Sequence, residues 1–185
     1  MLGHRRYRGT ILETTRSLLP VAPSLREMEF LNLDGVEVTN MMAGTSAVQF
    51  TVDVTPEDAI RCLNNLGSRL PLFLEDYPQD AYWKRYMRES RAGYRADRYG
   101  GPLSFDSLRD YCDKLAVHRA VAGGKLVAHE EVPTLDIHQF IKSVWWYFRL
   151  KRYGEQLCIE IRPLARRSDS MLDEQLALAL DAMAK

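Results

Sequence analysis

The chain has 185 residues and equal numbers of acidic and basic side chains, so its formal net charge at pH 7 is zero. That balance argues against a general binder of nucleic acids or anionic membranes, which usually carries an excess of basic residues. No apolar run reaches the roughly 18 residues that a membrane span needs. The length and ordinary composition predict one globular domain covering residues 1–185.

The cysteines and the N-terminus bear on where the protein resides. The three cysteines are far apart, odd in number and in no metal-ligand spacing. The basic N-terminus lacks the apolar stretch of a secretory signal. We therefore expect reduced thiols in a cytoplasmic protein.

The first third of the chain predicts one helix followed by two strands. Residues 4–19 can form an amphipathic helix that ends near Pro20. Strands are expected over residues 35–40 and 45–54, and the second alternates cleanly between apolar and polar side chains. The side chains expected on its core face are Val48, Phe50, Val52 and Val54. The opposite face would carry Ala47, Gln49, Thr51 and Asp53.

The middle of the chain predicts two further helices around an irregular segment. Thr55 can cap a helix that runs to about Leu70, with Pro56 in its first turn. Residues 75–103 are the least regular part, with aromatic and basic residues interleaved. Ser104 can cap the next helix.

The last third predicts a hairpin, two helices and a strand. The hairpin turns at Gly123–Gly124, and residues 134–146 form a helix. The strand Cys158–Pro163 follows, and Ser168 or Asp169 starts a final leucine-rich helix. Together these elements indicate an α+β fold, with an antiparallel or mixed sheet and helices on one of its faces.

The strand CIEIRP places an acid and a base on the same side of the sheet. Because side chains alternate along a strand, Ile159 and Ile161 mark the core face, and Glu160 and Arg162 lie opposite. Carboxylate oxygens bind Mg²⁺, and an arginine fork neutralises phosphoryl oxygens. One interpretation is therefore a metal and phosphate site in a cleft. The alternative is a pair of neighbours on a solvated sheet face that interact with cross-strand partners.

Three segments, in the same order and at similar distances, resemble the glutamate–cysteine ligase family, in the branch of plant-type enzymes and bacterial carboxylate–amine ligases. MMAGTSAVQFTVDV (41–54) is similar to a family strand, and YMRESRAGYRADRYGG (86–101) to its arginine-rich substrate loop. SVWWYFRLKRYGEQLCIEIRPL (143–164) resembles the segment leading into the family's Glu-x-Arg strand. The resemblance covers roughly residues 35–180.

This resemblance implies a glutamine synthetase-like fold whose sheet holds ATP and Mg²⁺. The family phosphorylates the γ-carboxylate of glutamate, and an amine such as that of cysteine then displaces the phosphate. By carry-over, Glu160 would bind Mg²⁺, and Arg162 would act as the catalytic residue that steadies the transferring phosphoryl group. Gln49, Arg88 and Arg98 would bind substrate.

The chain also departs from the family pattern. No acidic pair in the expected place precedes Met41, so the chain corresponds to the C-terminal two-thirds of the family's catalytic domain; Glu27 and Glu29 have the spacing but lie too close to the next motif. The alternative function is therefore that of a truncated, non-catalytic homologue that binds a ligand or a partner. A sheet that lacks an edge strand also predicts self-association. A single-stranded nucleic-acid site in residues 82–99 is a further alternative, which the zero net charge disfavours.

Overall fold

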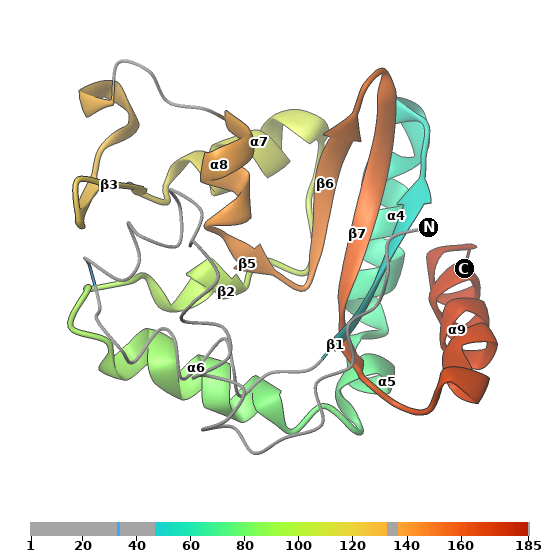
Figure 1. Ribbon diagram of the computed structural model, residues 1–185. Helices are drawn as coiled ribbons and strands as arrows, with labels where there is room; N and C mark the ends of the chain where they lie inside the picture. The colour runs from blue at the N-terminus through green and yellow to red at the C-terminus, as the bar shows by residue number, and fades with distance from the viewer. Residues whose placement is uncertain (1–32, 34–46, 133–136, 185) are drawn as a thin grey trace.

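The computed structural model describes residues 33, 47–132 and 137–184 (Figure 1). The fold is α+β, as predicted. Its three-stranded antiparallel sheet has the order β1-β7-β6, and its bounds are β1 Ala47–Asp53, β6 Phe148–Tyr153 and β7 Gln156–Ala165. Two smaller pairs are β2 Tyr99–Gly100 with β5 Trp145–Trp146, which is parallel, and β3 Ala120–Ala122 with β4 Lys125–Val127, which is antiparallel.

The helices occupy the segments between and after these strands. The α-helices are α4 Pro56–Ser68, α5 Leu70–Leu74, α6 Gln79–Glu89, α7 Leu108–Ala116, α8 Ile137–Lys142 and α9 Leu172–Ala184. Among the described residues, short 3-10 helices are η1 Ala96–Arg98, η2 His129–Glu131 and η3 Asp169–Met171.

One face of the three-stranded sheet is apolar and packs on helices. Helix α4 lies against β6 and β7, and α9 packs beside α4 (Figure 1). Val48, Ile159 and Ile161 are buried on this face, which confirms the alternation predicted for β1 and β7. Phe148 of β6 meets Phe73 of α5 edge to face, with ring centroids 5.3 Å apart. The core therefore lies between the sheet and helices α4, α5 and α9.

The strand register brings polar residues of all three strands together on the other face. Glu160 of β7 lies between Thr51 of β1 and Arg149 of β6. Nearer the end of β7 the register shifts, because Val48 pairs with Leu164 whereas Phe50 pairs with Ile161. Two β7 residues, 162 and 163, thus oppose one β1 residue, 49. This is a β-bulge, which bends the strand and redirects its side chains.

Of the two N-cap residues predicted from the sequence, Thr55 and Ser104, only Thr55 caps a helix in the structure. Thr55 caps α4 by accepting a hydrogen bond from the backbone N–H of Asp58 at 3.2 Å, as predicted. Helix α7 begins later than expected. Its cap is Ser107, which accepts from the N–H of Asp110 at 3.1 Å, and not Ser104. Both residues are serines before an apolar run, so the local signal does not separate them.

Two segments differ from the sequence-based expectations. The irregular segment 75–103 contains α6, whose buried side chains include Trp83 and Met87. The helix expected over 134–146 ends at Lys142, and Trp145–Trp146 form strand β5 beside β2 instead. Pairing with β2 buries both indole rings, and large aromatic rings favour strands.

Other predictions are confirmed or lie outside the described residues. The hairpin between β3 and β4 turns at Gly123 and Gly124, which have positive φ angles of 58° and 68°. The final helix begins after η3, near Asp169 as predicted. The helix over 4–19, the strand over 35–40 and the acidic pair at 27 and 29 lie outside the described residues.

Candidate ligand-binding site

Glu160 is the centre of a buried ionic cluster on the polar face of the sheet. One carboxylate oxygen lies 2.6 Å from Nε of Arg149 and 3.7 Å from a guanidinium nitrogen of Arg162. The other lies 3.3 Å from Nζ of Lys151. Only 5% of Glu160 is exposed, so it does not face an open cleft as expected. Of the residues that the structure describes, three cations lie around this one carboxylate.

The electrostatics keep Glu160 ionised. Burial acts to raise the pKa of Glu160, but attraction by Arg149 and Arg162, a hydrogen bond from Arg149 and attraction by Lys151 outweigh it and lower that pKa. The cluster is therefore an ion pair at neutral pH, with Arg149 as the nearest partner.

Arg149 also joins the cluster to the segment that follows α8. Its guanidinium donates to the backbone carbonyls of Ile141 and Val144, at 2.6 and 3.0 Å. These carbonyls are at the end of α8 and just before β5; that of Ile141 also accepts from the backbone N–H of Val144 at 3.1 Å. The same side chain thus fixes both Glu160 and the start of β5.

A cavity of about 80 Å³ lies next to this cluster, at the bulge in β7. Gln49 from β1 and Arg162 from β7 both line it. Arg162 is 19% exposed, against 6% for the side chain of Glu160. The remaining lining is mostly aromatic and consists of Ala47, Tyr77, Trp83, Tyr99, Trp145, Trp146, Tyr147 and Pro163. The structure therefore brings two of the predicted site residues into one cavity.

Tyrosine hydroxyls add polar atoms to the aromatic wall. Tyr147 donates a hydrogen bond to Asp80 of α6, and Lys84 pairs with the same carboxylate at 2.8 Å. Burial raises the pKa of Tyr147 far above its usual value, and Asp80 raises it further. Burial likewise raises the pKa of Tyr99, with repulsion from Tyr147 second. Both phenols are neutral donors at physiological pH.

Glycines let the chain pass close to this wall. A side chain at Gly101 would lie 2.3 Å from the indole ring of Trp146, and one at Gly100 would lie 2.9 Å from the ring of Tyr147. Both glycines also have positive φ, at 71° and 79°. Residues 100 and 101 are glycines because the backbone conformation and the close approach both exclude a side chain.

Arg98 lies outside this cavity, in a buried site of its own. Its guanidinium donates to the backbone carbonyl and the hydroxyl of Ser143, both at 2.9 Å, and to the carbonyl of Arg119 at 2.9 Å. The residue is 1% exposed, and burial lowers its pKa to about 10. It also lies over the ring of Tyr94, 5.4 Å from the centroid. This arrangement ties η1 to the segments before β3 and β5.

Arg88, the remaining predicted substrate residue, is exposed in the last turn of α6. It does not line the cavity that holds Gln49 and Arg162. Of the five predicted site residues, Gln49, Arg162 and Glu160 thus lie close together, whereas Arg88 and Arg98 are elsewhere.

The donor set around Glu160 does not fit Mg²⁺. Both carboxylate oxygens of Glu160 already contact cationic nitrogens of Arg149 and Lys151. Within residues 33, 47–132 and 137–184, no three acidic, histidine or cysteine side chains are grouped to hold a metal ion. A divalent cation prefers several oxygen ligands and no adjacent cation. We therefore derive no metal-dependent step from this arrangement.

The sequence analysis missed two cations of the cluster. Residues 148–153, for which no strand is predicted above, form strand β6 and place Arg149 and Lys151 beside Glu160. The alternation of Phe148 and Leu150 with these two cations carries that signal. Asp80 and Tyr147 were also missed, because nothing local links residues so far apart in the chain.

Comparisons with protein-family models, curated proteins and solved structures find no match. In the part of the chain that the structure describes, no helix has both the length and the apolar character to cross a membrane.

Proposed function

We propose that this chain binds a small carboxylate ligand in the cavity beside Arg162. The observation that carries the proposal is that Arg162 and Gln49, from two different strands, line one cavity with aromatic walls. The ligand class follows from the charge of the adjacent cluster, where Arg149, Lys151 and Arg162 outnumber Glu160. This is the ligand-binding alternative of the sequence analysis.

The geometry supports carboxylate binding in three ways. The guanidinium of Arg162 offers donors in a planar fork that matches a carboxylate, and it would be shared between the ligand and Glu160. The amide of Gln49 offers an additional donor. The aromatic walls, including Trp145 and Tyr147, surround the charges with less polar surface than water, which strengthens the attraction between them. Glutamate is the first ligand to test, because the sequence motifs point to it.

Titration calorimetry with L-glutamate tests this proposal. We expect binding to the intact chain, and a loss of about tenfold or more in affinity in Arg162→Gln, because a charged hydrogen-bond donor is removed. The matched control is Arg152→Gln, an arginine at the exposed end of neighbouring strand β6. It should bind glutamate as the parent does.

A ligand comparison provides the second control. L-Glutamine has nearly the same shape as glutamate but one carboxylate fewer, so its affinity separates recognition of the γ-carboxylate from recognition of the amino-acid end. The proposal is wrong if neither ligand binds, or if Arg162→Gln and Arg152→Gln bind glutamate equally well.

ATP-dependent amide formation is the second candidate, and the three collinear segments favour it. In this interpretation, the chain is a glutamate–cysteine ligase-like carboxylate–amine ligase that contributes to synthesis of glutathione or a related thiol. Its sheet would be part of a glutamine synthetase-like fold, and Arg162 and Gln49 would hold the γ-carboxylate. ATP and Mg²⁺ remain predictions from the resemblance, as does a cytoplasmic location.

Nucleotide turnover separates this candidate from simple binding. ADP release should depend on ATP, Mg²⁺, glutamate and cysteine together, and it should vanish in Arg162→Gln and Glu160→Gln. Glutamate binding without any ADP release would leave the chain as a binding module. Light scattering over a range of concentrations tests the accompanying prediction of self-association, which a monodisperse monomer would contradict.

A further inference from the structure

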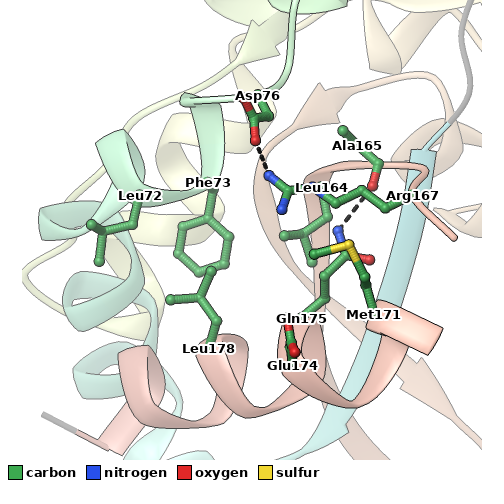
Figure 2. Close-up of a pocket in the computed structure, with 10 residues that line it drawn as sticks. All are labelled: Leu72, Phe73, Asp76, Leu164, Ala165, Arg167, Met171, Glu174, Gln175 and Leu178. Carbon is green, nitrogen blue, oxygen red and sulfur yellow. Dashed lines mark hydrogen bonds and ion pairs between the residues drawn. The ribbon is translucent and has the colours of Figure 1, made fainter. Parts of the chain in front are cut away.

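A larger cavity, of about 240 Å³, lies on the other side of β7 from the carboxylate site, between α5, the end of β7 and α9 (Figure 2). Pro163 lines the carboxylate site and the next residue, Leu164, lines this cavity. The lining consists of Leu72, Phe73, Asp76, Leu164, Ala165, Arg167, Met171, Glu174, Gln175 and Leu178. It combines an apolar interior with a few polar groups, which is typical of a small-molecule site.

Gln175 gives this cavity a directional polar group. Its side-chain N–H donates to the backbone carbonyl of Ala165 at 2.9 Å, and this contact sets the orientation of the amide. The residue is 6% exposed, and its oxygen Oε1 is buried without a hydrogen-bond partner in the part of the chain described here. A buried unpaired acceptor is costly, so a ligand that donates an N–H or O–H to Oε1 would relieve that cost.

Charged groups at the cavity favour a positive ligand. The carboxylate of Asp76 pairs with the guanidinium of Arg167 across the upper part of the cavity in Figure 2. Glu174 supplies a second carboxylate to the lining. Two carboxylates against one guanidinium leave a negative balance, which attracts an ammonium group and repels a carboxylate.

The rest of the cavity fits a short apolar body. Leu72, Phe73 and Leu178 line one part of it (Figure 2). Met171 lies over the amide of Gln175 in this view, and its flexible thioether side chain can turn aside for a donor. The volume is below the range of about 300–1,000 Å³ that is common for drug-sized ligands, so the ligand is a small one.

We propose that this cavity binds a small primary amine with an apolar body, whose ammonium group donates to Oε1 of Gln175 and faces the carboxylates of Glu174 and Asp76. The inference does not depend on the carboxylate site, because none of these residues lines that site.

Nuclear magnetic resonance with methyl-labelled methionine tests the proposal on the full chain. The probe is 3-methylbutylamine, and the matched ligand control is 3-methylbutanoate, which has the same body and a carboxylate. We expect the amine to shift the methyl resonance of Met171 saturably and to leave that of Met87, in the buried face of α6, unchanged. The carboxylate should produce no such shift.

Two variants locate the site. Leu178→Phe fills the cavity and should abolish the shift of Met171, whereas Leu180→Phe adds the same ring at an exposed position of α9 and should not. Gln175→Leu should weaken amine binding about tenfold through loss of the acceptor. Circular dichroism checks that each variant is folded.

The inference is overturned if the amine causes no saturable shift at Met171, if 3-methylbutanoate causes the same shift, or if Leu178→Phe and Leu180→Phe respond alike. Arg162→Gln serves as a separate check. It should leave amine binding intact while removing glutamate binding, so failure at one site is distinguishable from failure at the other.

Discussion

Two buried arginines hold this molecule together in different ways. Arg98 donates to neutral oxygens, the carbonyls of Ser143 and Arg119 and the hydroxyl of Ser143. Arg149 donates to two carbonyls as well, but it also has the carboxylate of Glu160 as a partner. The first charge is stabilised by dipoles and by the ring of Tyr94, and the second by dipoles together with an opposite charge.

This difference shows which region can respond to a ligand. All three nitrogens of the Arg98 guanidinium donate to other parts of the chain, which suits a structural role. Around Glu160 the cations exceed the carboxylate, and Arg162 reaches the cavity that Gln49 also lines. In the function proposed above, a ligand carboxylate would bind beside Arg162 in the second region and not at Arg98 in the first.

The largest effect should come from removing the charge at Arg98. Arg98→Met leaves two buried carbonyls and a hydroxyl without their donor, so we expect a loss of about 4 kcal/mol in the free energy of unfolding. Urea denaturation measures it. Arg95→Gln, at an exposed arginine three residues earlier that pairs with Asp97, is the control and should cost about 0.5 kcal/mol. Equal losses in the two variants would contradict a structural role for Arg98.

Glu160→Gln should rank next. It leaves the buried Arg149 and the half-buried Lys151 without their carboxylate, with an expected loss of about 3 kcal/mol in the free energy of unfolding. Glu155→Gln is the control, since Glu155 is 93% exposed in the turn between β6 and β7. It should change stability little.

The free energy of unfolding should also depend differently on pH in Glu160→Gln and Glu155→Gln. Because the folded-state pKa of Glu160 lies below its ordinary value of 4.5, the unfolded chain binds a proton more readily. The stabilisation is therefore fully present above pH 4.5 and is lost as the pH falls through the lowered pKa. Unfolding curves in acid should be less pH-dependent in Glu160→Gln than in Glu155→Gln. Parallel pH profiles would rule out this linkage.

Acid should also lower the stability through His118, a buried base near Arg98, but at a higher pH than through Glu160. Burial lowers its pKa to about 4; Asp97 opposes this, while Arg98, Arg95 and His129 add to it. Between about pH 6.5 and 4 the unfolded chain thus binds the extra proton, and stability falls as the pH falls.

The variant His118→Phe removes this titration and keeps an aromatic ring against Trp146, whose centroid is 5.7 Å away. We expect the parent to lose about 2 kcal/mol more than His118→Phe between pH 6.5 and 4. Guanidinium unfolding at several pH values measures the difference, and identical slopes would show that His118 is not the responsible group.

The sequence predicted the sheet better than it predicted the site. Alternation of apolar residues in β1 and β7 defined the core face, because that pattern depends only on the two-residue period of a strand. The same period put Gln49, Glu160 and Arg162 on the polar face. The bulge that directs Arg162 towards Gln49 could not be predicted, because it results from how β1 and β7 pair.

The surroundings of Arg98 and Glu160 could not be predicted from the sequence either. The resemblance implied that Arg98 contacts substrate, but Arg98 is buried, which is rare for arginine, and its acceptors at Ser143 and Arg119 are distant in the chain. Glu160 was expected at an open cleft, but its cations come from β6. Long-range contacts decide whether a charge is buried, paired or open, and no local pattern encodes them.

The smallest expected effect is that of a substitution at Lys151. It separates two roles of the cationic cluster, stabilising the sheet and attracting a ligand. Lys151 is 20% exposed and 3.3 Å from Glu160, so Lys151→Met should cost only about 1 kcal/mol of stability. It should also weaken glutamate binding about threefold, because a positive charge near the cavity is lost. Arg152→Met, with its side chain 61% exposed on the same strand, should change neither quantity. If Lys151→Met instead strengthened glutamate binding, the cluster would be stabilising the sheet and not attracting the ligand.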